Sequence, residues 1–484
     1  MRNLFRASLA VIAVLTAVST VEGHAAPLIG PQASAAEIRA AHGDPGPAYR
    51  IAYEKTIDGV SSPMEVTLAP GYVAIKSEDQ QTVLDFKLRR AIDIVPEKRS
   101  FANWSLFWHV SFRVHEAMNR THMRKTLRAM NSDLARQIDP YYVGAELGVP
   151  LPDEPNPAIE KTRGPDGTLG FVYDGVEVVS VTPSTVRLPG SLRQRFVQYM
   201  RYRLQVHPDI ADALAELEFV PQTISYVYMP NSALPESRHV TLELKSTGDA
   251  KADYPLPADY KPEPLTLTHS DELTPVRDLL PVMLQATAGT YGSGPRTTAS
   301  YKSAIDAAMR EKKILQALTL ALELSLQRGD QLETCDPADS SCHTFPEIIE
   351  AARKDERATA LMTSLQLDAT DPAAATAMRE GIDRKDISNA YLIDAFLANG
   401  LIAQDKRKEE ALRLLQGAIR GNPYASNFYQ DIGDYYVRSF DHNIAWLFYD
   451  FGRSLPERNQ AGNNVLAGVD RMEASLALSF PGFF

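Results

Sequence analysis

The chain has 484 residues, of which 44% are apolar and 23% are charged, and its net charge at pH 7 is −11. This length exceeds the size at which a single hydrophobic core keeps growing, so two or three domains are expected. The negative charge argues against nucleic acid or an anionic membrane surface as the main partner.

The first residues have the pattern of an export signal. Arg2 and Arg6 precede an uncharged, mostly apolar stretch from Ala7 to Val21, and Gly23-His24-Ala25 supplies the small residues that a signal peptidase requires. The apolar stretch is shorter than the roughly 18 residues needed to span a bilayer, so we expect cleavage after Ala25 and not a retained anchor. The mature protein is therefore expected to be periplasmic or secreted, with no transmembrane segment after removal of residues 1–25.

The next part of the sequence, roughly 200 residues long, has the pattern of an α+β domain. Residues 26–47 carry several prolines among alanine and glycine and are expected to be a flexible lead-in. From residue 48 to 250, short alternating runs predict antiparallel strands, and longer periodic runs predict helices. The strand candidates lie at 66–68, 72–75, 82–86, 91–95, 169–173, 176–181, 224–228 and 239–244, and the helix candidates lie at 102–138, 191–206 and 208–218. Asp174-Gly175 is a favoured two-residue hairpin turn between two of these strands.

A proline-rich stretch at 251–272 separates this domain from a helical one. It is expected to be a linker or a strap laid over a surface. Residues 273–484 read as all-helical, with one helix from Tyr301 to Gln327, another at 346–366, and shorter helices at 372–382, 388–403, 407–420, 425–437 and 443–453.

A recurrence at 34 residues occurs in the last two helix pairs. Its members are Ala411, Leu412, Leu415 and Ala418, which recur as Ala445, Trp446, Tyr449 and Gly452. Tyr429, Ile432, Gly433 and Tyr436 occupy the helix between these two sets, and Pro456 follows the second set. Small residues at this period let two helices cross closely. This pattern resembles the tetratricopeptide repeat, although the preceding unit, with Phe396, Gly400 and Pro423, is one residue shorter in its inter-helix turn.

The resemblance implies an α-solenoid whose first helices form a concave, peptide-binding surface. By that analogy, the residues expected to face a protein or peptide partner are Asn399, Asn427, Gln430, Asp431 and Asp434. The alternative is that they are ordinary solvated polar positions.

The two cysteines, Cys335 and Cys342, are expected to form a local disulfide in an exported chain. Metal binding with His343 is the alternative, but that set lacks a fourth ligand. We therefore expect no metal site.

The most enzyme-like passage is the histidine-rich stretch that contains His109, His115 and His122. On a helix, His115 and His122 lie roughly 10.5 Å apart along the axis, too far to share one ion. No nucleophile elbow, P-loop or dinucleotide motif is present, so no catalytic residue and no cofactor is predicted.

Two basic groups could hold a carboxylate, phosphate or acidic polysaccharide if both faced one cleft. The first comprises Arg113, Arg120, Arg124, Lys125 and Arg128, and the second comprises Arg193, Arg195, Arg201 and Arg203. The alternative is that both are solvated faces with local acidic partners.

The aromatic end of the sequence, Leu476–Phe484, is expected to cap the last repeat. These observations together favour an exported cell-envelope binding or scaffolding protein that engages a protein or peptide partner. The alternatives are an exported hydrolase with its site in the α+β domain or at the domain junction, and a carrier of an apolar ligand beneath the sheet.

Overall fold

A computed structural model of the chain describes residues 29–78, 80–136, 138–228, 237–251, 253–263, 274–328, 345–367, 371–385, 387–404, 407–456 and 466–484. The chain divides into two compact units. One contains Pro31–Pro264 and Met472–Phe484, and is called the sheet unit below. The other contains Leu265–Arg471, together with Ile29 and Gly30, and is called the helical unit.

The sheet unit is built on one sheet of 12 strands in the order β12-β6-β5-β4-β3-β2-β1-β11-β10-β9-β8-β7. Every pairing is antiparallel except that of β12 with β6. The strands are β1 (Ala48–Ile57), β2 (Val60–Ala69), β3 (Tyr72–Lys76), β4 (Gln81–Asp85), β5 (Arg90–Val95), β6 (Ser100–Ser105), β7 (Glu160–Arg163), β8 (Leu169–Tyr173), β9 (Val176–Thr182), β10 (Thr223–Tyr228), β11 (Arg238–Ala250) and β12 (Lys261–Pro262). The predicted α+β architecture with antiparallel strands is confirmed.

The expected hairpin at Asp174-Gly175 joins β8 to β9. Both residues have positive φ, 48° and 76°, which matches the right-handed twist of the flanking strands.

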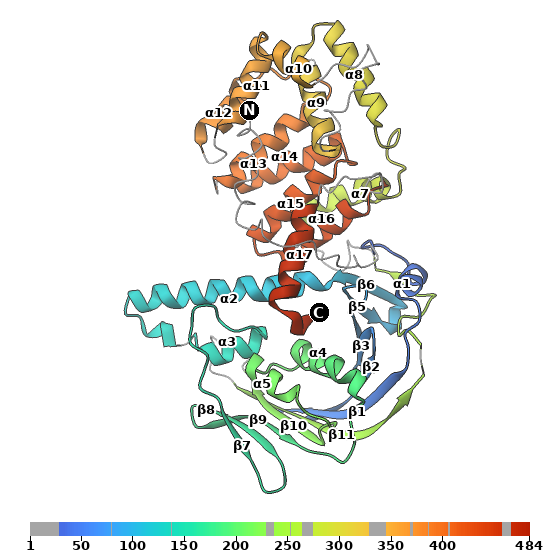
Figure 1. Cartoon of the computed structure of the whole chain (residues 1–484), viewed down its shortest axis with the longest axis vertical. Coiled ribbons are helices and arrows are strands. Elements are labelled where there is room, and N and C mark those ends of the chain that lie inside the picture. Colours follow the sequence, from blue (N-terminus) through green and yellow to red (C-terminus); the bar gives the residue numbers. More distant parts are fainter. Residues whose placement is uncertain are drawn as a thin grey trace. The chain divides into compact units, whose positions relative to one another are not determined.

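Helices cover the sheet on both faces, and Figure 1 shows the sheet curling around α4 (Arg193–Arg203) and α5 (Pro208–Leu214). We call this the inner face. The hydroxyl of Tyr199 in α4 lies 3.9 Å from the Sδ of Met64 in β2. The remaining helices of the first part of the chain are α1 (Ala35–His42), α2 (Leu106–Ala129), α3 (Pro140–Leu147), and the 3-10 turns η1 (Pro96–Lys98), η2 (Asp133–Arg136) and η3 (Gly190–Leu192).

The outer face of β3 and β4 is covered by α1 and by the proline-rich segment. Arg39 of α1 donates hydrogen bonds of 2.7 Å to the carbonyls of Tyr254 and Leu256. The buried His42 bonds Asp85 at 2.7 Å, and the Tyr254 hydroxyl donates to the same carboxylate at 2.7 Å. The range expected to be a flexible lead-in thus includes a helix, and part of the proline-rich range packs as a strap.

The expected helix at 102–138 begins later than the periodicity indicates. Ser100–Ser105 is strand β6, and Ser105 caps α2 by accepting a hydrogen bond from the backbone N–H of Phe107. The aromatic residues that suit the helix core also suit a buried strand, so the pattern hides the boundary.

The helical unit is a run of paired helices, as predicted. Its elements are η4 (Thr274–Leu279), α7 (Leu280–Thr287), α8 (Thr298–Arg310), α9 (Ile314–Arg328), α10 (Phe345–Ala352), α11 (Glu356–Gln366), α12 (Pro372–Glu380), α13 (Tyr391–Ala403), α14 (Lys408–Gly421), α15 (Ser426–Arg438) and α16 (His442–Arg453). The expected single helix at 301–327 is wrong, because Lys312 adopts a left-handed φ of 58° that separates α8 from α9. The expected helix at 346–366 is also two helices, because Asp355 caps the start of α11.

The boundary between the units falls within α17 (Ala467–Ser479), and η7 (Pro481–Phe483) follows it. The expectation that Leu476–Phe484 caps the last repeat is wrong, because Phe483 and Phe484 bury their rings in the sheet unit against Tyr202 and Phe107. Leu466 and Val469 are the buried residues at the end of the helical unit.

Candidate functional site in the paired helices

All five residues expected to face a partner lie on α13 or α15, the first helices of the last two pairs. Asn399 on α13 donates a hydrogen bond of 3.1 Å to the carboxylate of Asp431 on α15. One turn further along α15, the carboxylate of Asp434 accepts a hydrogen bond of 2.6 Å from the hydroxyl of Tyr449 on α16. The structure therefore brings Asn399, Asp431 and Asp434 into one polar row, which we call the α13–α15 row.

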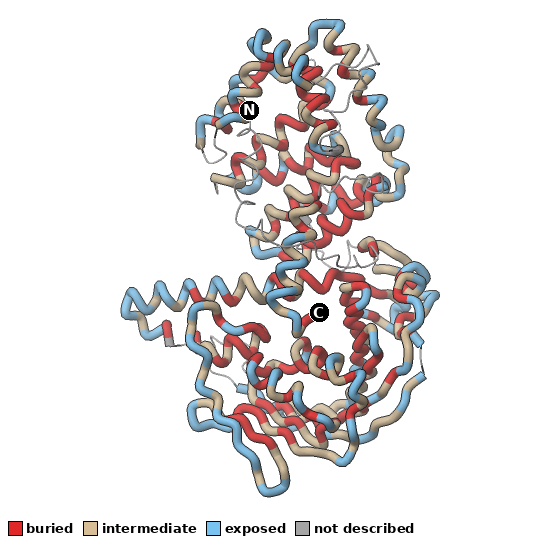
Figure 2. Tube along the Cα trace, in the orientation of Figure 1, coloured by how far each residue is buried: buried red, intermediate tan, exposed pale blue. Residues whose placement is uncertain are grey.

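Glycines set how closely the helices of each pair approach. A Cβ on Gly433 of α15 would lie 2.1 Å from the ring of Tyr449 on α16, and a Cβ on Gly421 of α14 would lie 2.2 Å from the ring of Tyr391 on α13. Only residues without a side chain fit these crossings. Figure 2 shows the resulting core as nearly continuous burial along α16.

The two carboxylates of the row are both half-buried. Burial raises the pKa of Asp431 to about 7, an effect that the Asn399 amide opposes and the nearby Asp434 reinforces. Burial also raises the pKa of Asp434, against the opposing effects of Tyr449, Arg438 and Gln430. No described residue forms an ion pair with either carboxylate, so a cationic group from outside would be favourable here.

Gln430 and Asn427 also lie on α15, and Gln430 adjoins the α13–α15 row. The Gln430 amide bonds the Asp434 carboxylate, and a Cβ on Gly468 of α17 would lie 3.2 Å from its Nε2 atom. Gln430 is therefore partly covered by the first turn of α17. Asn427 is half-buried on the same helix.

A buried polar network in the same unit gives no signal at the level of sequence. Glu323 of α9 is 1% exposed and accepts hydrogen bonds from Tyr391, Asn389 and Asn422 at 2.6, 2.8 and 2.6 Å. Asn389 and Tyr391 lie at the start of α13, and Asn422 follows the end of α14. Glu323 therefore links α9, α13 and α14. Because its oxygens are well supplied with donors, we assign it a structural role.

The three histidines of α2 do not converge. His115 bonds the backbone carbonyl of Ser111 at 3.0 Å, His109 stacks on Trp108 with ring centroids 3.6 Å apart, and His122 is exposed. Within the described residues, no group of three or more metal-binding side chains occurs. Cys335 and Cys342, expected to form a disulfide, lie outside the described residues, as does the expected signal segment.

Most of the α2 cations have local acidic partners. Arg120 contacts Glu146 at 2.8 Å, Arg124 and Arg128 share Glu154, and Lys125 contacts Asp153 at 3.2 Å. On α4, Arg193 faces Glu218 and Arg201 pairs with Asp212. These residues have the local acidic partners that the second interpretation expects, although Arg124 and Arg201 are largely buried in their pairs. Among the residues that the structure describes, Arg113, Arg195 and Arg203 form no ion pair.

No helix in the part of the chain that the structure describes is long and apolar enough to cross a bilayer. No family model, curated protein or solved structure matches the chain. Its function must therefore be argued from its own residues.

Proposed function

We propose that this chain is an exported binding or scaffolding protein of the cell envelope whose paired helices engage a protein or peptide partner. The observation that carries this proposal is the uncompensated Asp431 carboxylate, held at 3.1 Å by Asn399 from the neighbouring first helix. The resemblance of the last two pairs to tetratricopeptide repeats, and the export pattern at residues 1–25, support it.

The chemistry of the row favours a partner segment that carries a basic side chain. A desolvated carboxylate is costly by itself, and a lysine or arginine placed against it recovers part of that cost. Asn399 supplies an amide that can also bond the main chain of an extended segment. The half-buried position of Asp431 leaves it partly accessible.

The test is affinity capture from envelope extract with the full chain, compared between the natural sequence and Asp431→Lys. Charge reversal should abolish capture of any partner that binds the row, because like charges repel a basic segment. Glu380→Gln is the matched control, since Glu380 is exposed on α12 of the same unit and should leave capture unchanged.

Identified partners should then bind the purified chain more weakly as salt rises. Capture of the same proteins at the same level by Asp431→Lys would refute a role for this row.

A further inference from the structure

The sheet unit holds a second group of charged residues, which the binding proposal above does not use. Its members are Lys55 of β1, His109 and Arg113 of α2, and Arg203 at the end of α4, whose charge lowers the pKa of the other three. We call these four residues the inner-face basic cluster.

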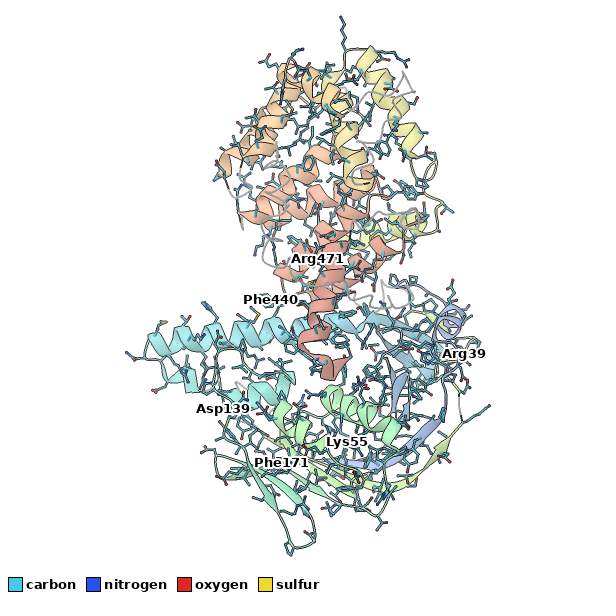
Figure 3. The ribbon with its side chains drawn as sticks, in the orientation of Figure 1. Arg39, Lys55, Asp139, Phe171, Phe440 and Arg471 are labelled. Carbon is cyan, nitrogen blue, oxygen red and sulfur yellow. The ribbon has the colours of Figure 1, made fainter. Side chains whose placement is uncertain are left out.

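The strand register and helix packing bring the cluster together. Met64, which contacts Tyr199 of α4, pairs with Tyr53 across β1 and β2. Lys55 is the next residue of β1 on the same face as Tyr53, and Arg203 follows Tyr199 by one helical turn. Lys55 thus lies on the side of the sheet that α4 covers (Figure 3).

Arg113 reaches the same end of α4 from the other side. Its Nη1 atom donates hydrogen bonds to the carbonyls of Leu147 and Arg201, at 3.0 and 3.4 Å, and its Cζ lies 5.8 Å from the centroid of the Tyr202 ring. The ring of His109 lies 6.4 Å from that of Tyr202. Arg113 and His109 of α2 therefore lie against the last turn of α4, the turn that carries Arg203.

The cluster has too little negative charge around it. Burial lowers the pKa of Lys55, His109 and Arg113, and the positive charge of Arg203 lowers each of them further. Asp93 of β5 is the carboxylate whose charge favours Arg203, and Thr82 already donates a hydrogen bond of 2.8 Å to it. Among the described residues, neither Lys55 nor Arg203 forms an ion pair or a side-chain hydrogen bond.

The site is nevertheless open to solvent and offers a further donor. Arg203 is exposed, so a ligand can reach it from solvent. Tyr53, two residues before Lys55 on the same face, is 2% exposed, and its hydroxyl has no hydrogen-bond partner in the part of the chain that the structure describes. A buried hydroxyl without an acceptor is rare and is satisfied by water or a ligand.

We propose that the inner-face basic cluster binds an oxyanion, a phosphate or sulfate group, with Arg203 and Lys55 as its main contacts. Unpaired guanidinium and ammonium groups are the side chains that recognise such groups, and an anion among them would relieve their mutual repulsion. The oxyanion could be free in solution or carried on a lipid headgroup, since both present the same chemistry.

The test is calorimetric titration of the full chain with inorganic phosphate and with sulfate at low ionic strength, together with co-sedimentation with phosphatidylglycerol vesicles and phosphatidylcholine vesicles. The natural sequence should bind at least one anionic probe saturably, whereas Lys55→Gln/Arg203→Gln should bind it at least tenfold more weakly. Arg163→Gln is the control, because Arg163 is exposed on β7 in the same unit. The affinity of this variant for the anion should stay within twofold of that of the natural sequence.

The double variant and Arg163→Gln should both remain folded, because none of the replaced cations forms an ion pair with a described residue. If the double variant does not fold, Arg203→Gln alone should still weaken binding at least threefold. Binding of phosphate or sulfate alone identifies a free anion, and binding of phosphatidylglycerol but not phosphatidylcholine identifies a headgroup. Failure of every anionic probe to bind the natural sequence, or equal binding by the folded variant, overturns the assignment.

Discussion

The side-chain amide of Asn399 donates a hydrogen bond of 3.1 Å to the carboxylate of Asp431 and so links the first helices of two successive pairs. Such a bond could be made equally well by two neutral amides. The carboxylate therefore adds a charge that the row does not need for its own packing, and that charge has an expected cost in stability.

Replacing Asp431 with asparagine should stabilise the helical unit at neutral pH but not at acid pH. The pKa of Asp431 is about 7 in the folded chain against an ordinary value of 3.8, so the folded state retains a proton that the unfolded state releases. The stability from this proton is complete below pH 3.8 and is lost as the pH rises toward 7. Asp431→Asn should therefore gain on the order of 1–3 kcal/mol at pH 8 and almost nothing at pH 4.

Urea unfolding of the full chain at both pH values measures this difference, with Glu380→Gln as the variant that should show no pH-dependent gain. A variant that is less stable than the natural sequence at pH 8 would show that the row needs its carboxylate. The expected gain in stability with a loss of partner binding would place Asp431 among residues kept for function.

The closeness of α15 to α16 should depend on Gly433. An added Cβ would lie 2.1 Å from the Tyr449 ring, and this ring is fully buried and tied to Asp434 by its hydroxyl. Gly433→Ala should therefore destabilise the helical unit by roughly 1–3 kcal/mol, because neither neighbour can move freely.

Gly417 of α14 provides the opposite case, since nothing lies within 4 Å of its ideal Cβ position. Gly417→Ala should stabilise the chain by roughly 0.5–1 kcal/mol through the backbone entropy of the unfolded state. Thermal unfolding of both variants is the measurement. Equal and small effects of the two substitutions would show that the pair can open to admit a side chain.

Local patterns predicted the elements, and they failed where long-range contacts decide. Alternation located β2 to β5, and the turn chemistry of Asp174-Gly175 located one hairpin. The pairing of β1 with β11 joins segments far apart in the chain, and no local pattern encodes it. The break at Lys312 has no local signal, because lysine is a good helix former and its left-handed backbone is not encoded by residue type.

The candidate sites divide in the same way. The repeat period placed Asn399 and Asp431 on successive first helices, which is a local property of two helix pairs. The basic groups of α2 and α4 gave no means of separating Arg113 and Arg203 from neighbours with acidic partners. That distinction depends on which side of each helix faces the sheet and on the position of Glu146 and Glu154.

The last residues of the printed sequence should contribute to the stability of the sheet unit. Phe483 is 1% exposed, meets Tyr202 edge to face at 5.3 Å, and lies under the guanidinium of Arg113 at 5.4 Å. Phe483→Ala should lower the free energy of unfolding by about 3–5 kcal/mol, because it removes a buried ring and leaves a cavity.

Leu478→Ala is the control, since Leu478 is 68% exposed and its loss should change stability by less than about 0.5 kcal/mol. Thermal unfolding compares them, and a Phe483→Ala chain as stable as the natural one would mean that this segment does not pack on the sheet unit.

His109 should make the sheet unit sensitive to mild acid. Burial, Arg113 and Arg203 together lower its pKa to about 3, whereas in the unfolded chain it has the ordinary value of 6.5. Between these values the unfolded chain binds a proton that the folded chain does not, so stability is complete above pH 6.5 and falls as the pH is lowered.

His109→Gln should remove about 1 kcal/mol of this loss at pH 5, a value reduced because the ring is only half-buried. His122→Gln, on the exposed part of the same helix, should leave the pH dependence unchanged. Urea unfolding at pH 7 and pH 5 distinguishes the two variants. If the free energy of unfolding of His109→Gln changes with pH as it does in the natural chain, His109 titrates alike in the folded and unfolded states.

Phosphate held by the inner-face basic cluster would raise the pKa of His109. Added phosphate should therefore lessen the acid sensitivity of the natural sequence and not that of Lys55→Gln/Arg203→Gln.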